Sequence, residues 1–154
     1  MNGRVFVLSL LLNQIIAVCF LPLTLLVRPG NSLAEWFLTE PCYNLVYLEA
    51  ARCQIRQLPA NLAVLIPNVR TLNLNFNFIS DVQPLQGLTR LRKLSLVGSH
   101  MQGTKSLIKA VRRMTELELV DFRYVSYIQP SNLHPILLLI RPLDVGAKVD
   151  VSLY

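Results

Sequence analysis

VRTLNLNFNFISDV, residues 69–82, is the stretch that decides the fold. Its centre, LNL, alternates apolar and polar residues, which predicts a short strand with Leu72 and Leu74 on one face and Asn73 on the other. The chain must then turn sharply, and the amide side chain of Asn77 can pair backbone groups that the turn leaves without partners. The five apolar positions are Val69, Leu72, Leu74, Ile79 and Val82. One such unit cannot bury its own apolar face, so the pattern implies neighbours of the same kind.

The same spacing recurs three more times along the chain. Counted from its first apolar residue, the unit has apolar positions at +3, +5, +10 and +13 and a turn residue at +8. Units begin at Leu45, Val69, Leu91 and Leu117, which are 24, 22 and 26 residues apart. Their turn residues are Cys53, Asn77, Ser99 and Val125. A period of about 20–29 residues with this pattern is typical of leucine-rich repeats. We therefore predict an α/β leucine-rich-repeat solenoid, with about four to six strands in one short parallel sheet on the concave face and helices or 3₁₀ turns on the convex face.

The connections between the predicted strands supply the convex layer. Residues 59–67 and 84–91 each begin with proline and carry leucines spaced to face inward, which predicts a short helix or 3₁₀ turn in both. Residues 104–114 form the longest helical pattern, with one apolar and one basic face. The expected inward residues are Leu62, Leu65, Leu85, Leu88, Leu107, Ile108, Val111 and Met114, and the basic face holds Lys105, Lys109, Arg112 and Arg113.

Composition sets limits on the class of protein. A chain of 154 residues, 53% hydrophobic, is long enough for one domain with a substantial core. The net charge of +6 is a modest bias toward acidic partners and does not predict nucleic-acid binding. Three cysteines at irregular spacing do not predict a disulfide framework, and a buried Cys53 at a turn fits a reducing compartment.

The apolar N-terminal run, residues 5–27, has two open interpretations. It carries no formal charge and lies between two arginines, which is typical of a signal peptide or membrane anchor. The repeat template also fits, in one unit from Leu23 and a shorter one from Val5. In these units Leu26 and Leu8 should occupy the strand position that Leu48 holds in the next repeat. Membrane association is expected only if the run is a targeting segment.

Three regions follow from these patterns. Residues 1–20 are an apolar segment, either an irregular repeat or a targeting segment. Residues 21–125 are the leucine-rich-repeat domain. Residues 126–154 contain three prolines and no match to the template, and we expect an irregular tail.

The sequence shows no constellation that carries catalysis. His100 and His134 have no cysteine or second histidine at metal-ligand spacing, and the six glycines form no phosphate-binding loop. We therefore predict no catalytic, cofactor-binding or metal site and no enzymatic activity.

The outward positions of the predicted strands, +2, +4 and +6, are the candidate partner-binding surface. Solenoids commonly use this extended concave face for recognition, and mixed charges with amides suit a protein partner. Adjacent Asn73 and Asn75 can pair with exposed backbone of such a partner. The candidate binding residues are Tyr47, Glu49, Thr71, Asn73, Asn75, Lys93, Ser95, Asp121 and Arg123, and Ala51, Val97 and Leu119 fill the remaining outward positions. The basic helix face of residues 104–114 is the rival surface.

The run from Cys42 to Phe122 resembles a known family of scaffold proteins. The segments that carry the likeness are NLVYLEAARCQIRQLP, IPNVRTLNLNFNFISDVQPLQGLTRLRKLSLVG and ELELVDFR, and LVRPGNSL is similar to the repeat that precedes them there. The family is the fungal spindle-pole-body scaffold of the septation initiation and mitotic exit networks, related to centriolin. Ser99 and Val125 depart from the asparagine expected at their turns.

The resemblance implies a role in cell division. In that family the repeats are the C-terminal part of a longer protein that is anchored at the spindle pole body and recruits regulators of a small GTPase and kinase cascade controlling cytokinesis. By resemblance, this chain is expected to be a truncated C-terminal repeat fragment located in the cytoplasm at the spindle pole body. The alternative is a secreted or membrane-anchored leucine-rich-repeat recognition protein, and the fate of residues 1–27 distinguishes the two.

Overall fold

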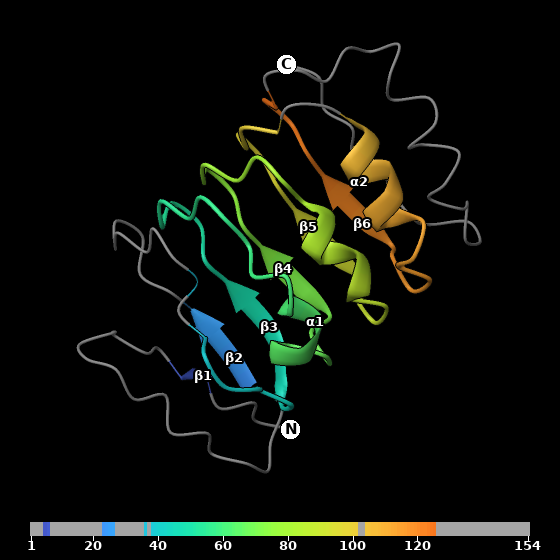
Figure 1. Ribbon diagram of the computed structural model, residues 1–154. Coiled ribbons are helices and arrows are strands. Elements are labelled where there is room, and N and C mark those ends of the chain that lie inside the picture. Colours follow the sequence, from blue (N-terminus) through green and yellow to red (C-terminus); the bar gives the residue numbers. More distant parts are fainter. Residues whose placement is uncertain (1–4, 7–22, 27–35, 37, 102–103, 126–154) are drawn as a thin grey trace.

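Parallel strands form one layer of the molecule and helices the other. The computed structural model describes residues 5–6, 23–26, 36, 38–101 and 104–125. Within these, the strands lie side by side in chain order, each parallel to the next (Figure 1). The strands are β1 Val5–Phe6, β2 Leu23–Leu26, β3 Leu45–Glu49, β4 Thr71–Asn73, β5 Lys93–Ser95 and β6 Leu119–Asp121. Each unit of the sequence pattern therefore adds one strand, and the predicted leucine-rich-repeat solenoid is confirmed.

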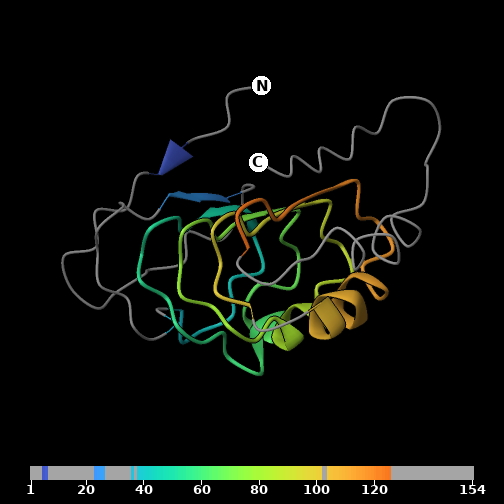
Figure 2. The same cartoon turned by 90° about the horizontal axis from the view of Figure 1, so that it is seen from above.

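The helical segments cover one face of the sheet. They are α1 Leu62–Leu65, the 3₁₀ helix η1 Gln83–Gly87 and α2 Thr104–Val111, and Figure 2 shows them below the strands. α1 and α2 lie inside the stretches where the sequence predicts them, and η1 begins one residue before its predicted stretch, 84–91. The expected inward residues are buried, except Ile108, which is partly buried against the core.

Register keeps equivalent residues of the repeats in columns. Leu48 pairs with Leu72, Leu72 with Leu94, and Leu94 with Val120 across successive strands. All four side chains have no solvent exposure, so the inward faces of the strands form one continuous apolar surface.

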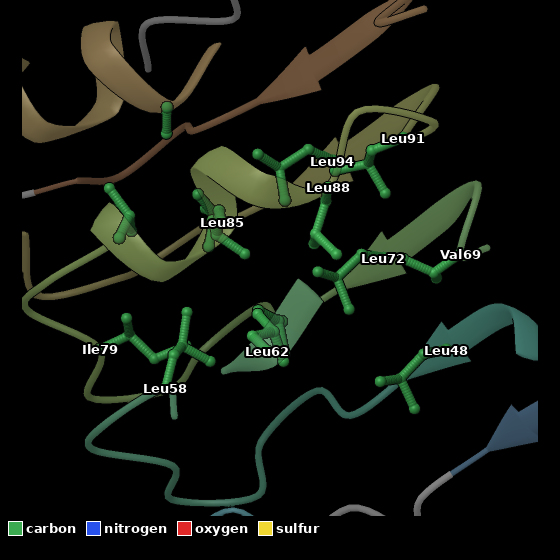
Figure 3. Packing of buried hydrophobic residues seen from close by; sticks show 14 of the residues in the cluster. Leu48, Leu58, Leu62, Val69, Leu72, Ile79, Leu85, Leu88, Leu91 and Leu94 are labelled. Carbon is green, nitrogen blue, oxygen red and sulfur yellow. The ribbon is translucent and has the colours of Figure 1, made fainter. Parts of the chain in front are cut away.

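The core fills the space between the strands and the helical segments. Figure 3 shows leucines of the strands and of the helices packed against one another, among them Leu48, Leu62, Leu72, Leu85 and Leu94. Burial of each such side chain stabilises the fold by about 1.5–3 kcal/mol relative to leaving it exposed. No single repeat encloses these residues, because each touches side chains of its neighbours, and the array folds only as a stack.

The buried amide of Asn77 joins two repeats. Its side chain, in a residue 1% exposed, accepts hydrogen bonds at Oδ1 from the backbone N–H groups of Cys53 and Ile55, at 3.0 and 3.1 Å. Its Nδ2 donates to the carbonyl oxygens of Ala50 and Leu74, both at 2.8 Å. Three of these four backbone groups belong to the preceding repeat. The predicted role of Asn77 is confirmed, and an apolar residue in its place would leave buried groups unpaired at a cost of about 1–3 kcal/mol.

The other turn positions are buried but bond less widely. Cys53 and Ser99 are 0% and 1% exposed, as the template expects. The Ser99 hydroxyl donates to the carbonyl oxygen of Leu96 at 2.7 Å, within its own repeat. Val125, at 8% exposure, has no side-chain group to satisfy backbone and contributes packing alone. Among the four turn residues, the side chain of Asn77 therefore bonds to the most backbone groups.

The N-terminal strands join the same sheet, with a register that differs from expectation. β2 pairs in parallel with β3, and β1 with β2. Leu25, not Leu26, lies across from Leu48, because the register shifts by one residue between Leu23 and Thr24. Leu23 does lie across from Leu45, as the template expects, and the residues from Thr24 on lie one position earlier than it expects.

The remainder of the N-terminal question lies largely outside the described residues. Phe6 is the Cα partner of Leu25, so Phe6 stands in the column of Leu48, where the template expects Leu8. The targeting interpretation of residues 1–20 and the predicted tail at 126–154 otherwise concern residues that the structure does not describe. Within the residues that it does describe, no helix is both long enough and apolar enough to span a bilayer.

Gly87 is predicted to tolerate no side chain. It ends η1, and a Cβ added there would lie 2.5 Å from the Cβ of Ala63 in α1. Gly87→Ala should lower the free energy of unfolding by about 1–3 kcal/mol, as expected for overpacking. The measurement is urea unfolding followed by circular dichroism.

A double-mutant cycle separates this contact from the general effect of the substitution. In an Ala63→Gly background the opposing methyl group is gone, so Gly87→Ala should cost nothing measurable. Equal losses in both backgrounds would contradict the close packing of α1 against η1.

Candidate functional site: the concave face

The sheet face opposite the helices presents the candidate residues together. Register places Thr71 between Tyr47 and Lys93, and Asn73 between Glu49 and Ser95. Asp121 follows Ser95 on β6. All nine predicted binding residues are at least partly exposed, namely Tyr47, Glu49, Thr71, Asn73, Asn75, Lys93, Ser95, Asp121 and Arg123.

One outward assignment was wrong. Val97 was expected to face outward with Asn75 and Arg123, but it is only 6% exposed. It lies beyond the end of β5, where strict alternation of side chains no longer applies. Ala51 and Leu119, the other apolar residues at outward positions, are partly exposed as expected.

Two pairs of side chains on this face bond to each other. The Tyr47 hydroxyl donates to Glu49 Oε2 at 2.9 Å, and the guanidinium of Arg123 donates to the carboxylate of Asp121 at 3.0 and 2.7 Å. Burial, and then the hydrogen bond from the hydroxyl to Glu49, raise the pKa of Tyr47. A partner that uses these groups must compete with bonds that the face already makes.

Asn75 has a structural role that the sequence did not predict. Its Oδ1 accepts hydrogen bonds from the hydroxyl of Ser95 and the backbone N–H of Val97, at 2.7 and 2.8 Å. Its own backbone N–H donates to Oδ1 of Asn73 at 3.1 Å. Asn75 therefore joins its repeat to the following one. Its Oδ1 already accepts two hydrogen bonds, so it offers a partner only its Nδ2 donor, whereas Asn73 offers its Nδ2 donor and the second lone pair of its Oδ1.

Side-chain donors that have no hydrogen-bond partner within the described residues lie together at the centre of the face, on and next to β4 and β5. Within the described part of the chain, neither the Thr71 hydroxyl nor the Lys93 ammonium has a hydrogen-bond partner. These two residues are cross-strand neighbours, and the Nδ2 groups of Asn73 and Asn75 follow on β4 and just after it. The four residues Thr71, Asn73, Asn75 and Lys93 form what we call the central patch.

The other potentially reactive groups in the described residues are two thiols. Cys42 and Cys53 are both buried, and burial raises the pKa of each. A raised pKa lowers the thiolate fraction and therefore the reactivity of these groups. Across the described ranges, no three histidine, cysteine or acidic residues come close enough together to hold a metal ion.

The rival basic surface is present on α2 and the turn after it. Lys105, Lys109, Arg112 and Arg113 are exposed, and none has an acidic partner within the described residues. This face lies on the helical side of the molecule (Figure 2). The two candidate surfaces are therefore separate and can be altered independently.

A third exposed group was missed by the sequence reasoning. Phe76, Phe78 and Tyr124 are 46%, 47% and 66% exposed, on the loops that follow β4 and β6. The signal was present in the quoted stretch, where NFNF places a phenylalanine on each side of Asn77 at positions that the template leaves polar. The strand pattern alone does not mark these loop positions.

Comparison with known proteins places the repeats among leucine-rich repeats. The family model described as "Leucine Rich repeats (2 copies)" matches residues 67–110. The chain is 34% identical over 77 residues to the septation initiation network scaffold protein cdc11 of Schizosaccharomyces pombe. That match covers 50% of this chain and 7% of cdc11, so this chain spans only a small part of the length of that protein.

Two solved structures are also similar to this chain. Internalin C2 (inlC2) of Listeria monocytogenes shares 17% identity with a TM-score of 0.46, over 73% of this chain and 54% of that one. Internalin inlF of the same species shares 16% identity with a TM-score of 0.45, over 76% and 36% of the two chains.

Asn75→Ala is predicted to destabilise the array. Loss of Oδ1 leaves the Val97 N–H and the Ser95 hydroxyl without their acceptor, and an unpaired group of this kind costs about 1–3 kcal/mol. The matched control is Asn61→Ala, because Asn61 is exposed and makes no side-chain capping bond. The control should change the free energy of unfolding in urea by no more than about 0.5 kcal/mol. Equal effects at both sites would show that Asn75 does not join the repeats.

Proposed function

We propose that this chain is a non-enzymatic protein-binding module that uses its concave face, as part of a scaffold for septation and mitotic exit. The observation that supports binding there is the central patch of Thr71, Asn73, Asn75 and Lys93, whose donors have no partners within the described residues. A hydroxyl, two amides and an ammonium in register on adjacent strands can donate to the carbonyl oxygens of an extended segment.

The character of the face favours a protein over a nucleic acid. Cationic and anionic groups alternate on it, with Lys93 on one strand and the Asp121–Arg123 pair on the next. A nucleic-acid surface would instead carry mainly positive charge with aromatic rings between. Tyr47, on β3 of the same face, is of a residue type enriched at protein interfaces.

The finer proposal concerns the cellular role. It is supported by the similarity to cdc11, a septation initiation network scaffold protein by name, and by the resemblance of residues 42–122 to the spindle-pole-body family. On this proposal the chain acts in the cytoplasm at the spindle pole body, and its partners are regulators of the small GTPase and kinase cascade. The overlap is half of this chain, so the role is inferred for the repeats and not for the rest of cdc11.

The pairing of β1 and β2 into the sheet supports this proposal over a secreted or membrane-anchored recognition protein. That alternative requires residues 1–27 to be cleaved or inserted into a membrane. β2 instead pairs with β3 over four residues, in the place of a further repeat.

Substitutions in the central patch are predicted to remove partners while the fold stays intact. The full chain serves as bait in extract of dividing S. pombe cells, and bound proteins are identified by mass spectrometry. Thr71→Ala with Lys93→Glu should weaken capture of septation initiation network regulators by roughly tenfold, equivalent to about 1.4 kcal/mol. Neither side chain bonds within the described residues, so the urea unfolding curve should hardly move.

The rival surface provides the comparison. Lys109→Glu, Arg112→Glu and Arg113→Glu reverse the charge of the basic helix face, and this variant should retain the same proteins. Should it lose them while the central-patch variant keeps them, the concave face is not the binding surface. If neither the wild type nor either variant captures any network protein, the result would contradict the scaffold role.

A further inference from the structure

Two arginines on the loop after β3 lie against two exposed aromatic rings on the loop after β4. The guanidinium carbon of Arg52 lies 4.8 Å from the ring centroid of Phe76, and that of Arg56 lies 6.0 Å from the centroid of Phe78. The ring centroids of Phe78 and His100 lie 5.2 Å apart, and the two ring planes are tilted by 48°. We call this group, Arg52, Arg56, Phe76, Phe78, His100 and Tyr124, the aromatic ridge. In Figure 1 these loops stack beside the strand ends, away from both the sheet face and the helices.

The backbone beneath the ridge has a conformation that favours glycine. The residue before each turn position has a positive φ in all four repeats: Arg52 at 55°, Phe76 at 55°, Gly98 at 65° and Tyr124 at 56°. Only one of the four is glycine, although the left-handed region disfavours residues with a Cβ. The chain thus accepts strained positions for an arginine and two aromatic residues that stand largely in solvent. The same φ recurs in every unit, so the turn of the repeat holds these residues in it, and at Arg52, Phe76 and Tyr124 it carries an exposed side chain.

Gly98 keeps the ridge continuous. A Cβ at this position would lie 2.7 Å from Cδ1 and 3.1 Å from Cε1 of Phe76. The ring of Phe76 therefore rests against the bare backbone of the next repeat, with Arg52 of the previous repeat over its face. Three successive repeats build this one contact surface.

The charge of the ridge is positive and uncompensated. Neither Arg52 nor Arg56 forms an ion pair with any residue that the structure describes. The ridge itself contains no acidic side chain. The guanidinium donors, apart from their contact with the rings, are therefore available to an acceptor from outside, and arginine beside exposed aromatic rings is typical of the residues that dominate protein interfaces.

We propose that the aromatic ridge is a second binding surface, distinct from the concave face, and that its occupant is an acidic protein segment carrying an apolar side chain. Carboxylates of the segment accept from Arg52 and Arg56, and the apolar side chain packs against Phe76 and Phe78. Single-stranded nucleic acid fits less well, because an arginine already covers a face of each phenylalanine ring and base stacking needs that face.

Peptide selection tests the proposal without a known partner. A phage library of random peptides of about twelve residues is selected on the full chain, with counter-selection on an Arg52→Glu, Arg56→Glu variant. Peptides specific to the wild type should be rich in aspartate and glutamate and contain a leucine or an aromatic residue. Their affinity, measured by fluorescence anisotropy, should fall about tenfold or more in the Arg52→Glu, Arg56→Glu variant and in Phe76→Ala, Phe78→Ala.

A matched control removes the effect of net charge. Lys105→Glu with Lys109→Glu on α2 changes the charge by the same amount at exposed positions, and should change the affinity less than about twofold. Circular dichroism and urea unfolding check that each variant is folded. The Thr71→Ala, Lys93→Glu variant should bind the peptides normally, so failure at the ridge and failure at the concave face can be told apart.

Three results would overturn the proposal. One is the absence of any acidic enrichment among the selected peptides. Another is equal loss of affinity in the ridge and α2 charge variants, which would indicate a net-charge effect. The third is tighter binding of a labelled oligothymidylate than of any selected peptide, abolished by the ridge substitutions, which would assign the ridge to single-stranded nucleic acid.

Discussion

A parallel array of short strands must satisfy the backbone groups of its turns from within, and two asparagine side chains do this for the central repeats. Asn77 reaches back to the repeat before it, and Asn75 reaches forward to the repeat after it. The Asn77 bonds are buried away from water and those of Asn75 are partly buried, and together the two amides fix the turn and the spacing of neighbouring repeats. The columns of buried leucines depend on that spacing, and so does every surface that the array presents.

The sequence predicted the features that periodicity controls. Strand alternation gave the faces of β3 to β6, and the spacing of leucines gave the inward side of the helical segments. It could not predict features that depend on contacts between repeats. The early register of β2 follows a shift of one residue that no pattern marks, and the role of Asn75 depends on Val97 of the next repeat. Val97 was misassigned and the aromatic ridge was missed because both lie past the strand ends. There the direction of a side chain depends on the backbone φ of the turn and no longer on strand alternation.

The positions of the candidate residues follow the template more closely than their bonding does. Seven of the nine lie on β3 to β6, and Asn75 and Arg123 follow the ends of β4 and β6. The hydroxyl of Tyr47 and the guanidinium of Arg123 are already bonded to neighbouring carboxylates. What remains for a partner is concentrated near Thr71 and Lys93. The array therefore offers a polar concave centre, a cationic aromatic edge and a basic helical face in three directions. This separation of surfaces follows from stacking one repeat on the next.

Amide hydrogen exchange measured by NMR tests most directly whether the Asn77 side chain stands in for backbone pairing. The N–H groups of Cys53 and Ile55 bond to Oδ1 of Asn77, whereas the N–H of Ala50 bonds to the backbone oxygen of Asn73. If the side chain is a permanent part of the core, the first two amides should exchange as slowly as that of Ala50. Exchange at Cys53 and Ile55 as fast as at the exposed loop residue Gln57 would contradict the account, because the turn would then be open to water.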